Sequence, residues 1–305
     1  MSDLVLPLQS SFIPGMSTHD NVLVIQELIH SLRKSKGRVG GMVIKLDLEK
    51  AYDKVNWEFL EQTLDFFGFP PNLVRLIMFC VTNSKPRVLW NGEPLTPFVP
   101  SCGLRQGDPL STYLFVLCVE RLGYLVEHEV NEGKWDPLPV CRGGPRFSHL
   151  FFADDLLFMA KATKENATTI NSILEKFCGS LGLLVNKAKS QIFFSKNTDR
   201  GIRRCISGLL GFGCTNDLGK YLGAPLVHNR VSSNLYNELI DRVQSRLTTW
   251  KAKMLNIAER TALIQSVTPA MPSYIMQSSW ISTAVCNRLD KLNRVFFVGI
   301  RWELS

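Results

Sequence analysis

Sites built from cysteine or histidine find no support in this sequence of 305 residues. Its eight cysteines and five histidines are dispersed, with no Cys-x-x-Cys pair and no group at the spacing of zinc ligands. We therefore expect reduced, mostly buried cysteines and no histidine-based metal site or catalytic triad. Any bound metal ion would need oxygen ligands.

The sequence also lacks the runs that mark membrane insertion or export. No apolar run approaches the roughly 18 residues of a membrane helix, and the start, Met1-Ser2-Asp3-Leu4, does not resemble a signal peptide. Hydrophobic residues make up 45% and charged residues 20%, as in ordinary globular proteins. We expect an intracellular protein with no evident targeting signal and no membrane partner.

Positive charge is in modest excess. Lysine and arginine (35) outnumber aspartate and glutamate (27) by 8, and the isoelectric point of about 9.1 is near the level that suggests a polyanionic partner. A solvated helix face would explain any one of the three basic clusters. These clusters are Arg33, Lys34, Lys36 and Arg38; Lys196, Arg200, Arg203 and Arg204; and Arg242, Arg246, Lys251, Lys253 and Arg260.

Two adjacent aspartates, Asp154 and Asp155, interrupt an otherwise apolar run from Phe151 to Met159. Moving an ionised carboxylate into apolar surroundings costs several kcal/mol unless it is paired or bound to a cation. The pattern favours two strands joined by a tight turn, with both aspartates at its tip. An exposed Asx-type turn between buried strands is an alternative that the run alone leaves open.

Another carboxylate, Asp47, ends the apolar strand expected over residues 42–48. A helix is expected from about 55 to 67, with Asp53 as its N-cap and Gly68 as its C-terminal stop. Two strands that each end in carboxylate can lie side by side in one antiparallel sheet. Three clustered carboxylates suit Mg²⁺, a hard cation that prefers oxygen ligands.

A second helix is expected after Pro70-Pro71, from 72 to about 83. The Asn91-Gly92 pair that follows is a strong hairpin signal. A glycine-rich loop then leads into a long helix, with Asp108 as N-cap and Pro109 at the first helical position. Capping of this helix does not account for Arg105-Gln106-Gly107. These residues form a donor-rich turn at the helix N-terminus, which could hold a phosphate or a base.

The remaining chain reads as a helix from 170 to 181 stopped by Gly182, and then a short hairpin of 183–186 with 191–194 that presents Lys187 and Lys189. From about 196 the chain becomes basic and loop-like until a small hairpin at 221–226. Helices near 233–254, 256–268 and 284–299 indicate a separate helical subdomain.

Four segments in this order carry a family resemblance: "KLDLEKAYD" (45–53), "GLRQGDPLS" (103–111), "FADD" (152–155) and "NKAKS" (186–190). They resemble the successive motifs of reverse transcriptases, above all those of LINE-type, non-LTR retrotransposons common in plant genomes. Residues 10–15 and 20–22 also match the segment that precedes the palm in that family. The resemblance covers nearly the whole chain.

The resemblance implies a role for each matching residue. The catalytic and metal-binding carboxylates would be Asp47, Asp154 and Asp155. The nucleotide-binding residues would be Tyr52, Arg105, Gln106, Gly107 and Lys189. The primer-gripping hairpin would contain Tyr221, Leu222 and Gly223. The nucleic-acid backbone would be contacted by Arg242, Arg246, Lys251, Lys253 and Arg260. Simple core packing for Tyr52 and a surface charge for Lys189 are the alternatives.

The implied fold is an α+β right-hand polymerase with an antiparallel palm sheet and a helical thumb. Its parts would be truncated fingers (1–41), palm with interleaved fingers elements (42–195), a connector with a primer-grip-like hairpin (196–232) and a thumb-like region (233–305). Met16 and Thr112 depart from the family pattern, and the endonuclease domain that relatives usually carry is not expected here.

The implied function is RNA-directed DNA synthesis in the nucleus, with Mg²⁺ or Mn²⁺, an RNA template, a DNA primer and dNTPs. A catalytically inactive retroelement remnant that only binds nucleic acid is the main alternative. A metal-dependent phosphodiesterase built on the same carboxylates is another, although no histidine or other obvious general base lies near the motifs.

Overall fold

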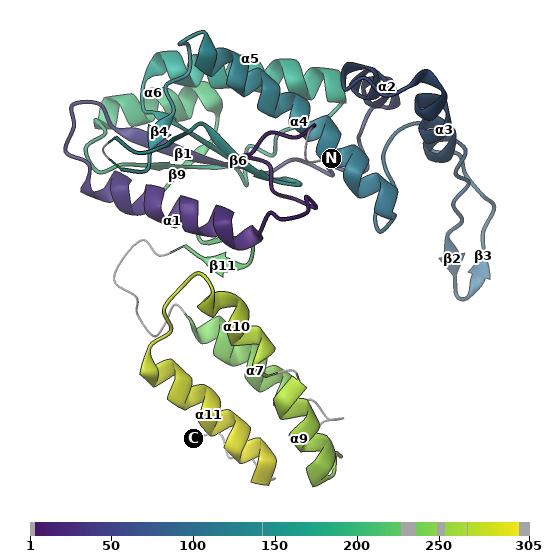
Figure 1. Ribbon diagram of the computed structural model, residues 1–305, viewed down its shortest axis with the longest axis vertical. Helices are drawn as coiled ribbons and strands as arrows, with labels where there is room; N and C mark the ends of the chain where they lie inside the picture. Colours follow the sequence, from purple (N-terminus) through teal and green to yellow (C-terminus); the bar gives the residue numbers. More distant parts are fainter. Residues whose placement is uncertain (1–3, 142, 227–235, 249–253, 267, 299–305) are drawn as a thin grey trace. The chain divides into compact units, whose positions relative to one another are not determined.

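The computed structural model describes residues 4–141, 143–226, 236–248, 254–266 and 268–298 (Figure 1). The chain divides into two compact units, Met1–Leu218 and Gly219–Ser305, and each has its own hydrophobic core. The division falls within the stretch 196–232 that the sequence predicts as a connector.

The first unit alternates helices with short strands. Its elements are, in chain order, α1 (Thr18–Lys34), β1 (Gly41–Leu46), α2 (Trp57–Phe66), α3 (Pro71–Thr82), β2 (Leu89–Trp90), β3 (Glu93–Pro94), α4 (Pro109–Asn131), β4 (Leu138–Pro139), β5 (Arg146–Phe147), β6 (His149–Phe152), β7 (Asp155–Lys161), α5 (Lys164–Leu181), β8 (Gln191–Phe194), α6 (Arg200–Leu210) and β9 (Gly213–Thr215).

The central sheet has five strands in the order β6-β7-β1-β8-β9. β1 is antiparallel to both of its neighbours, β7 and β8, whereas β9 is parallel to β8. β1 and β7 are buried along most of their length because α1 covers one face of the sheet and α4 and α5 cover the other (Figure 1). This arrangement confirms the predicted α+β class with an antiparallel sheet.

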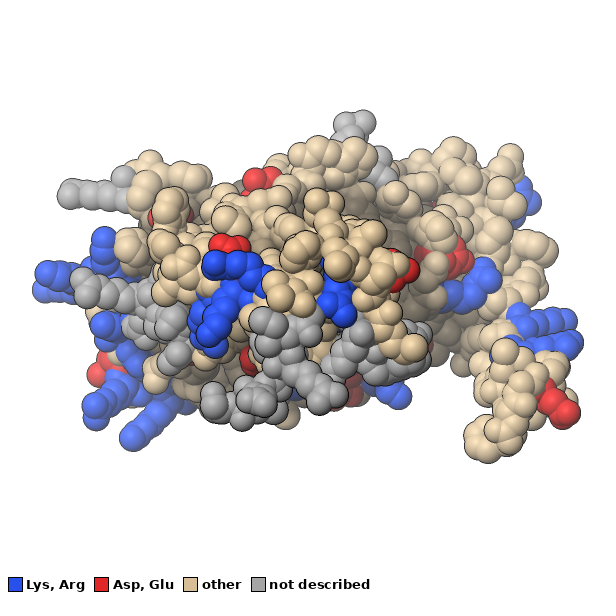
Figure 2. All heavy atoms as spheres, turned by 90° about the horizontal axis from the view of Figure 1, so that it is seen from below, with Lys and Arg blue, Asp and Glu red and all other residues tan. Residues whose placement is uncertain are grey.

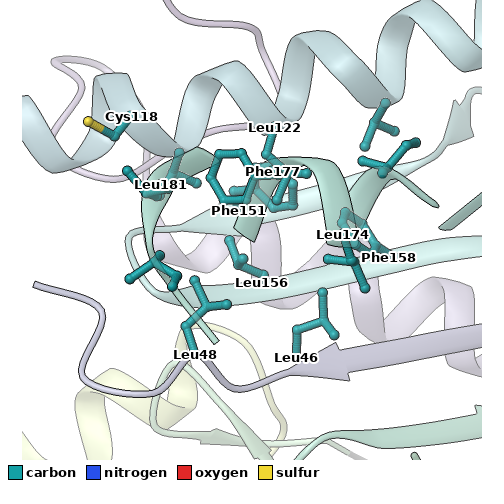
Figure 3. Close-up of a cluster of buried hydrophobic side chains, with 14 of the residues drawn as sticks. Leu46, Leu48, Cys118, Leu122, Phe151, Leu156, Phe158, Leu174, Phe177 and Leu181 are labelled. Atoms are coloured by element: carbon teal, nitrogen blue, oxygen red, sulfur yellow. The ribbon is translucent and has the colours of Figure 1, made fainter. Parts of the chain in front are cut away.

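Side chains from alternate strand positions meet the helices in one large cluster (Figure 3). Leu46 of β1 and Leu156 of β7 lie there with Leu122 of α4 and Phe177 of α5. Full burial of a side chain of this size contributes about 1.5–3 kcal/mol. The cluster therefore holds β1 against β7 close to the ends where the acidic residues lie.

Helix α4 is, among the described residues, the one helix long and apolar enough to cross a membrane. Length and composition alone do not separate a membrane span from a central core helix. In this protein 61% of the most apolar 18-residue stretch of α4 is buried. Its burial against the sheet is that of a core helix.

Most helix ends follow the predicted signals. The Asp108 side chain accepts a hydrogen bond from Leu110 N at 3.0 Å, and Pro109 is the first residue of α4. Gly182, at φ +79°, ends α5 in the left-handed conformation that glycine adopts most readily. The N-cap prediction for α2 is wrong: Asn56 caps this helix, accepting from Glu58 N and Phe59 N.

Other predictions need correction. The stretches 183–186 and 191–194 do not pair with each other: β8 pairs with β1, and Val185 forms a single bridge to Leu48. The region after 196 is not simply loop, because Asp199 caps α6 with hydrogen bonds to Gly201 N and Ile202 N. All eight cysteines are free as expected, but five of them are exposed and one is fully buried.

The second unit begins with a small hairpin, β10 (Lys220–Tyr221) and β11 (Ala224–Pro225), as predicted. Its described helices are α7 (Asn237–Thr248), α9 (Ile257–Ser266), α10 (Ala270–Met276) and α11 (Thr283–Val298). α7 and α11 bury apolar faces against each other, with Val243 and Val285 almost completely inaccessible. α10 falls outside the helices that the sequence predicts.

Candidate active site

The sheet register brings the three predicted carboxylates to one end of the central strands. β1 and β7 are antiparallel, and Leu46 pairs with Leu156. Continuing this register by one residue places Asp47 opposite Asp155. Asp154 belongs to the two-residue turn between β6 and β7, because Phe152 pairs with Asp155 across it. The predicted hairpin is therefore present, but its tip is Ala153 and Asp154: the prediction that Asp155 also lies at the tip is wrong, because Asp155 is the first residue of β7.

The turn itself has an unusual backbone. Ala153 has φ +52°, although it carries a Cβ and is almost fully buried. A non-glycine residue in this left-handed conformation costs roughly 1–2 kcal/mol. Such strain persists where the surrounding packing holds it, and it is common at functional sites. Here the strained turn is followed directly by Asp154.

The acidic groups affect one another's ionisation. Partial burial is the main cause that raises the pKa of Asp155 above its usual range, and the charges of Asp154 and Asp47 raise it further. The positive charge of Lys45 acts in the opposite direction. Mutual repulsion of this kind is what a bound divalent cation would relieve.

The donor chemistry fits Mg²⁺, but the side chains as placed do not form a finished ligand set. Among the described residues, no three acidic, histidine or cysteine side chains converge closely enough to hold a metal ion together. Asp47 instead forms an ion pair with Lys189, with Oδ2 and Nζ 4.0 Å apart. The Asp47 side chain is 43% exposed, so it is free to change rotamer.

The segment that carries Lys189 is tied to the backbone of Asp47. Asp47 N donates to Ser190 Oγ at 3.2 Å, and Asn186 N donates to Asp47 O at 2.8 Å. The β1–β8 pairing ends at Lys45 and Gln191, and the turn that precedes β8 brings Lys189 Nζ to 4.0 Å from Asp47 Oδ2. Asp47 thus has an acid on one side and a lysine on the other.

Tyr52 lies beside the same carboxylates. Its ring stacks on Phe115 of α4 with centroids 4.3 Å apart. Burial raises the pKa of Tyr52, the charge of Asp154 raises it further, and a hydrogen bond with Thr112 lowers it. The half-buried position of Tyr52 next to Asp154 is therefore compatible both with core packing and with the predicted contact to a nucleotide.

The glycine-rich loop is joined to the loop after Asp47. Leu104 N donates to Tyr52 O at 2.7 Å, and Gly103 N donates to Val55 O at 2.8 Å. Gln106 Nε2 approaches Asp53 Oδ1 at 3.4 Å. Asp53, which does not cap a helix, thus contacts the loop that holds the predicted nucleotide-binding residues.

A cavity of about 490 Å³ opens beside this loop. Arg105 and Gln106 line it, together with Trp57 and Phe98, two residues that the sequence did not single out. Arg105 Nη2 also lies 3.2 Å from Asp108 Oδ2, which orients the guanidinium at the N-terminus of α4. The cavity joins cationic, amide and aromatic groups in one place, a combination suited to a nucleotide.

In the second unit, the hairpin predicted to grip the primer is held by α10. Tyr221 is 1% exposed, and the turn residues Leu222 and Gly223 have φ +50° and +79°. The Tyr274 hydroxyl of α10 donates to Leu222 O. Tyr221 is thus buried, and the turn residues Leu222 and Gly223 are the more accessible part of the hairpin.

The predicted backbone-binding residues differ in their surroundings. Arg242 pairs with Glu238 at 2.7 Å, and Arg246 is exposed on the same helix. Arg260 donates to Leu255 O at 3.0 Å and lies over the Phe296 ring at 5.8 Å, so it has a structural role. Lys251 and Lys253 lie outside the described residues. On the face that Figure 2 shows, lysines and arginines form several separate patches.

Similar sequences come from mobile genetic elements. The chain is 26% identical over 271 residues to the transposon TX1 uncharacterized 149 kDa protein of Xenopus laevis, covering 88% of this chain and 20% of that protein. It is 26% identical over 184 residues to the Pol polyprotein from the type-2 retrotransposable element R2DM of Drosophila melanogaster, covering 60% of this chain and 16% of that protein. The chain thus spans at most about a fifth of these two relatives.

Similar structures support the fold. Telomerase from Candida tropicalis, in complex with a fragment of telomeric RNA, aligns with 95% of this chain and 43% of its own length. The TM-score is 0.53 at 12% sequence identity. Telomerase from Candida albicans aligns with a TM-score of 0.50 at 14% identity, over 95% of this chain and 48% of its own.

The sequence profile described as "Reverse transcriptase (RNA-dependent DNA polymerase)" matches residues 2–226. This match includes Asp47, the glycine-rich loop and the Asp154–Asp155 turn. The relatives from the TX1 and R2 elements agree with the predicted non-LTR retrotransposon origin. The chain belongs to the reverse transcriptase (RNA-dependent DNA polymerase) family.

Proposed function

We propose that this chain is an RNA-directed DNA polymerase that extends a primer 3′-hydroxyl with dNTPs along an RNA template. The observation that carries the proposal is the placement of Asp47 opposite Asp155 in the β1–β7 register, with Asp154 in the adjoining turn. Three carboxylates at one sheet end suit phosphoryl transfer to a nucleotide. The cavity lined by Arg105 and Gln106 does not include these carboxylates, and it is joined to them through the loop that contains Tyr52 and Asp53.

Asp47, Asp154 and Asp155 would hold Mg²⁺, with Mn²⁺ as a possible substitute. When bound, the metal supplies positive charge that activates the attacking hydroxyl and stabilises the leaving phosphate oxygens. The chain's own part is to bring the carboxylates together and to screen them. Lys189, which pairs with Asp47 in the structure, would contact the triphosphate.

The neighbouring residues would select and orient the nucleotide. Tyr52, supported from behind by Phe115, would contact the sugar of the incoming nucleotide and disfavour a 2′-hydroxyl. Arg105, Gln106 and Gly107 would line the base pair and the template. The free face of the Gly107 backbone supports this role, because no atom lies within 4 Å of the position a Cβ would take.

The second unit would bind the primer-template duplex. The turn Leu222–Gly223 would contact the primer, and the exposed Arg246 and the Glu238-paired Arg242 would meet phosphates along the backbone. An RNA template, a DNA primer and dNTPs are the partners this requires, and we expect the protein to act in the nucleus.

The test is primer extension on an RNA template with labelled dNTPs and Mg²⁺. We compare the native chain with Asp154→Asn and with Asp65→Asn, which removes an exposed carboxylate from α2. Incorporation by the native chain and Asp65→Asn but not by Asp154→Asn is the expected result. Incorporation by Asp154→Asn at the native rate would contradict the assigned site. Binding of primer-template without incorporation by any variant would contradict the proposed activity.

A further inference from the structure

Two ionisable side chains with no part in the proposed reaction are buried beside the aspartate hairpin. Glu120 of α4 is 0% exposed and His149 of β6 is 2% exposed. Buried ionisable groups of this kind are normally fully hydrogen-bonded. Within the described part of the chain, however, Glu120 Oε2 and His149 Nε2 have no hydrogen-bond partner.

Both side chains approach the same glycine. A Cβ placed on Gly123 would lie 3.4 Å from Glu120 Oε1, 3.4 Å from His149 Nε2 and 3.4 Å from a methyl group of Leu6. The absence of a side chain at Gly123 thus lets the carboxyl, the imidazole and the N-terminal segment (residues 4–13) meet. The two unpartnered atoms belong to groups that share this small space.

The other carboxyl oxygen is already engaged. Leu6 N donates to Glu120 Oε1 at 2.8 Å, which ties the N-terminal segment to α4. The other ring nitrogen of His149 is engaged too, since Nδ1 lies 3.0 Å from Ser148 Oγ. Each side chain therefore has one polar atom in a hydrogen bond and one polar atom without a hydrogen-bond partner among the described residues.

The N-terminal segment in turn covers the open edge of the sheet. β6 is an edge strand, and Phe151 of β6 donates its N–H to Leu8 O at 2.9 Å and accepts from Ser10 N at 3.2 Å. Unpaired edge strands are mobile and exposed unless another segment covers them. Phe151 lies only three residues before Asp154, so the same contacts help to fix the catalytic turn.

We propose that Glu120 is a positioning residue: its neutral carboxyl fastens the N-terminal segment to the outer edge of the aspartate hairpin and shares its proton with His149 Nε2. Because the structure places no direct hydrogen bond between them, the proton is shared through one buried water that bridges Glu120 Oε2 and His149 Nε2. The proposal rests on the proposed function for its effect on catalysis, but the clamp itself can be tested without any polymerase activity.

The protonation states agree with this arrangement. Burial is the main cause that raises the pKa of Glu120 to about 7, although the hydrogen bond from Leu6 N acts in the opposite direction, and burial lowers the pKa of His149 to about 3. Below about pH 7 the acid is therefore the donor and the neutral imidazole the acceptor. The other titratable groups that act on Glu120 are Tyr124 and Glu127 of its own helix, and the segment 4–13 contains no charged residue.

The first test is hydrogen exchange of peptides covering residues 4–13 and 146–152, with Glu120→Gln, Glu120→Ala and the control Asp65→Asn. Asp65 is an exposed acid on α2. Glutamine keeps an acceptor for Leu6 N and a donor for His149. The exchange protection of both peptides in Glu120→Gln should therefore match that in the native chain at pH 6. Protection in the native chain should fall as pH passes through about 7, and protection in Glu120→Gln should not. Equal pH dependence in both would overturn the proposal.

The second test is steady-state primer extension. Glu120→Ala should lower kcat by about tenfold or more, because small displacements of reacting groups cost large factors in rate. The KM for dNTP should stay within about twofold, and Glu120→Gln should restore kcat. A Glu120→Ala variant as active as Asp65→Asn would overturn the proposal, as would a Glu120→Gln variant as impaired as Glu120→Ala. Should Glu120→Ala fail to fold, the exchange comparison of Glu120→Gln with the native chain decides.

Discussion

At the scale of one residue, the ionised carboxylate of Asp155 lowers the folding stability of the protein. Asp155 begins a buried strand and faces the charges of Asp154 and Asp47, so its ionised form is disfavoured and its pKa is raised. A raised pKa means that folding stability is highest below the pKa of the unfolded chain and declines as pH rises through that of the folded protein.

We therefore predict that Asp155→Asn unfolds at a higher temperature than the native chain at pH 7.5 without divalent metal, while losing incorporation. The thermal difference should vanish below pH about 4, where aspartate is protonated in both states. Thermal unfolding followed by circular dichroism at both pH values checks this. A lower unfolding temperature for Asp155→Asn at pH 7.5 would show that the carboxylate is stabilised rather than strained.

The position of Tyr52 supports a second prediction. Its ring lies against Phe115 and next to Asp154, where the sugar of an incoming nucleotide would pass. Tyr52→Ala should raise the incorporation of rNTPs relative to dNTPs by about tenfold or more, because the excluding ring is gone. Tyr52→Phe keeps the ring and should keep the selectivity. Unchanged selectivity in Tyr52→Ala would leave core packing as the role of this side chain.

At the scale of elements, the glycine-rich loop is held by one close backbone approach. Gly103 has φ +91°, and a Cβ there would lie 2.5 Å from Asp53 O. Gly107, in the same loop, has φ +85° but open space around it. Both glycines adopt a left-handed backbone conformation, but only at Gly103 would a Cβ clash with a neighbouring atom.

Gly103→Ala should therefore be less stable than Gly107→Ala. The left-handed conformation costs both variants roughly 1–2 kcal/mol, and the clash with Asp53 O adds to the cost for Gly103→Ala alone. Urea unfolding of the two variants measures the difference. Equal stability would mean that the loop shifts freely away from residues 52–55, despite the hydrogen bonds from Gly103 N and Leu104 N to that segment.

Helix ends and turns that depend on a few neighbouring residues could be predicted from the sequence. Pro109, Gly182 and the Asn91-Gly92 turn were all identified, since capping and turn preferences act over a few residues. The pairing of β8 was not, because its partner β1 is about 150 positions away and either partner satisfies the same apolar pattern. The cap at Asn56 was missed because Asp53 is an equally good capping residue in the sequence.

The residues around the candidate site likewise include some that the sequence could predict and some that it could not. Asp47, Asp154 and Asp155 stood out because each interrupts an apolar strand, a conflict visible in the sequence alone. Glu120 and His149 gave no such signal: they are 29 positions apart, and only the packing of α4 against the edge strand brings them to Gly123. α6 was missed although Asp199 and the spacing of Ile206 and Leu210 could have indicated a capped amphipathic helix.

For the whole molecule, the proposed function assigns the chemistry to the first unit and duplex binding to the second. The carboxylates, Tyr52 and the glycine-rich loop all lie in the first unit, and the exposed arginines of α7 lie in the second. Arg246 and Arg260 provide a matched comparison, because one is exposed and the other is bonded to Leu255 O and stacked on Phe296.

Arg246→Gln should weaken primer-template binding and reduce the dependence of log Kd on log salt by about one, the change expected for one lost phosphate contact. Arg260→Gln should instead lower the unfolding temperature and leave the salt slope unchanged. Fluorescence titrations at several salt concentrations and thermal unfolding separate these effects. A reduced slope for Arg260→Gln would assign it to the duplex rather than to the core.

The measurement that tests the central claim most directly is primer extension by Asp47→Asn, Asp154→Asn and the double variant. If both carboxylates belong to one site, each single change should remove at least about 99% of incorporation, and the double variant should be no worse than either, because groups that act as a unit are not additive. Circular dichroism should show that all three remain folded. Substantial activity in Asp47→Asn, or multiplicative losses in the double variant, would contradict a single site formed where β1 meets β7.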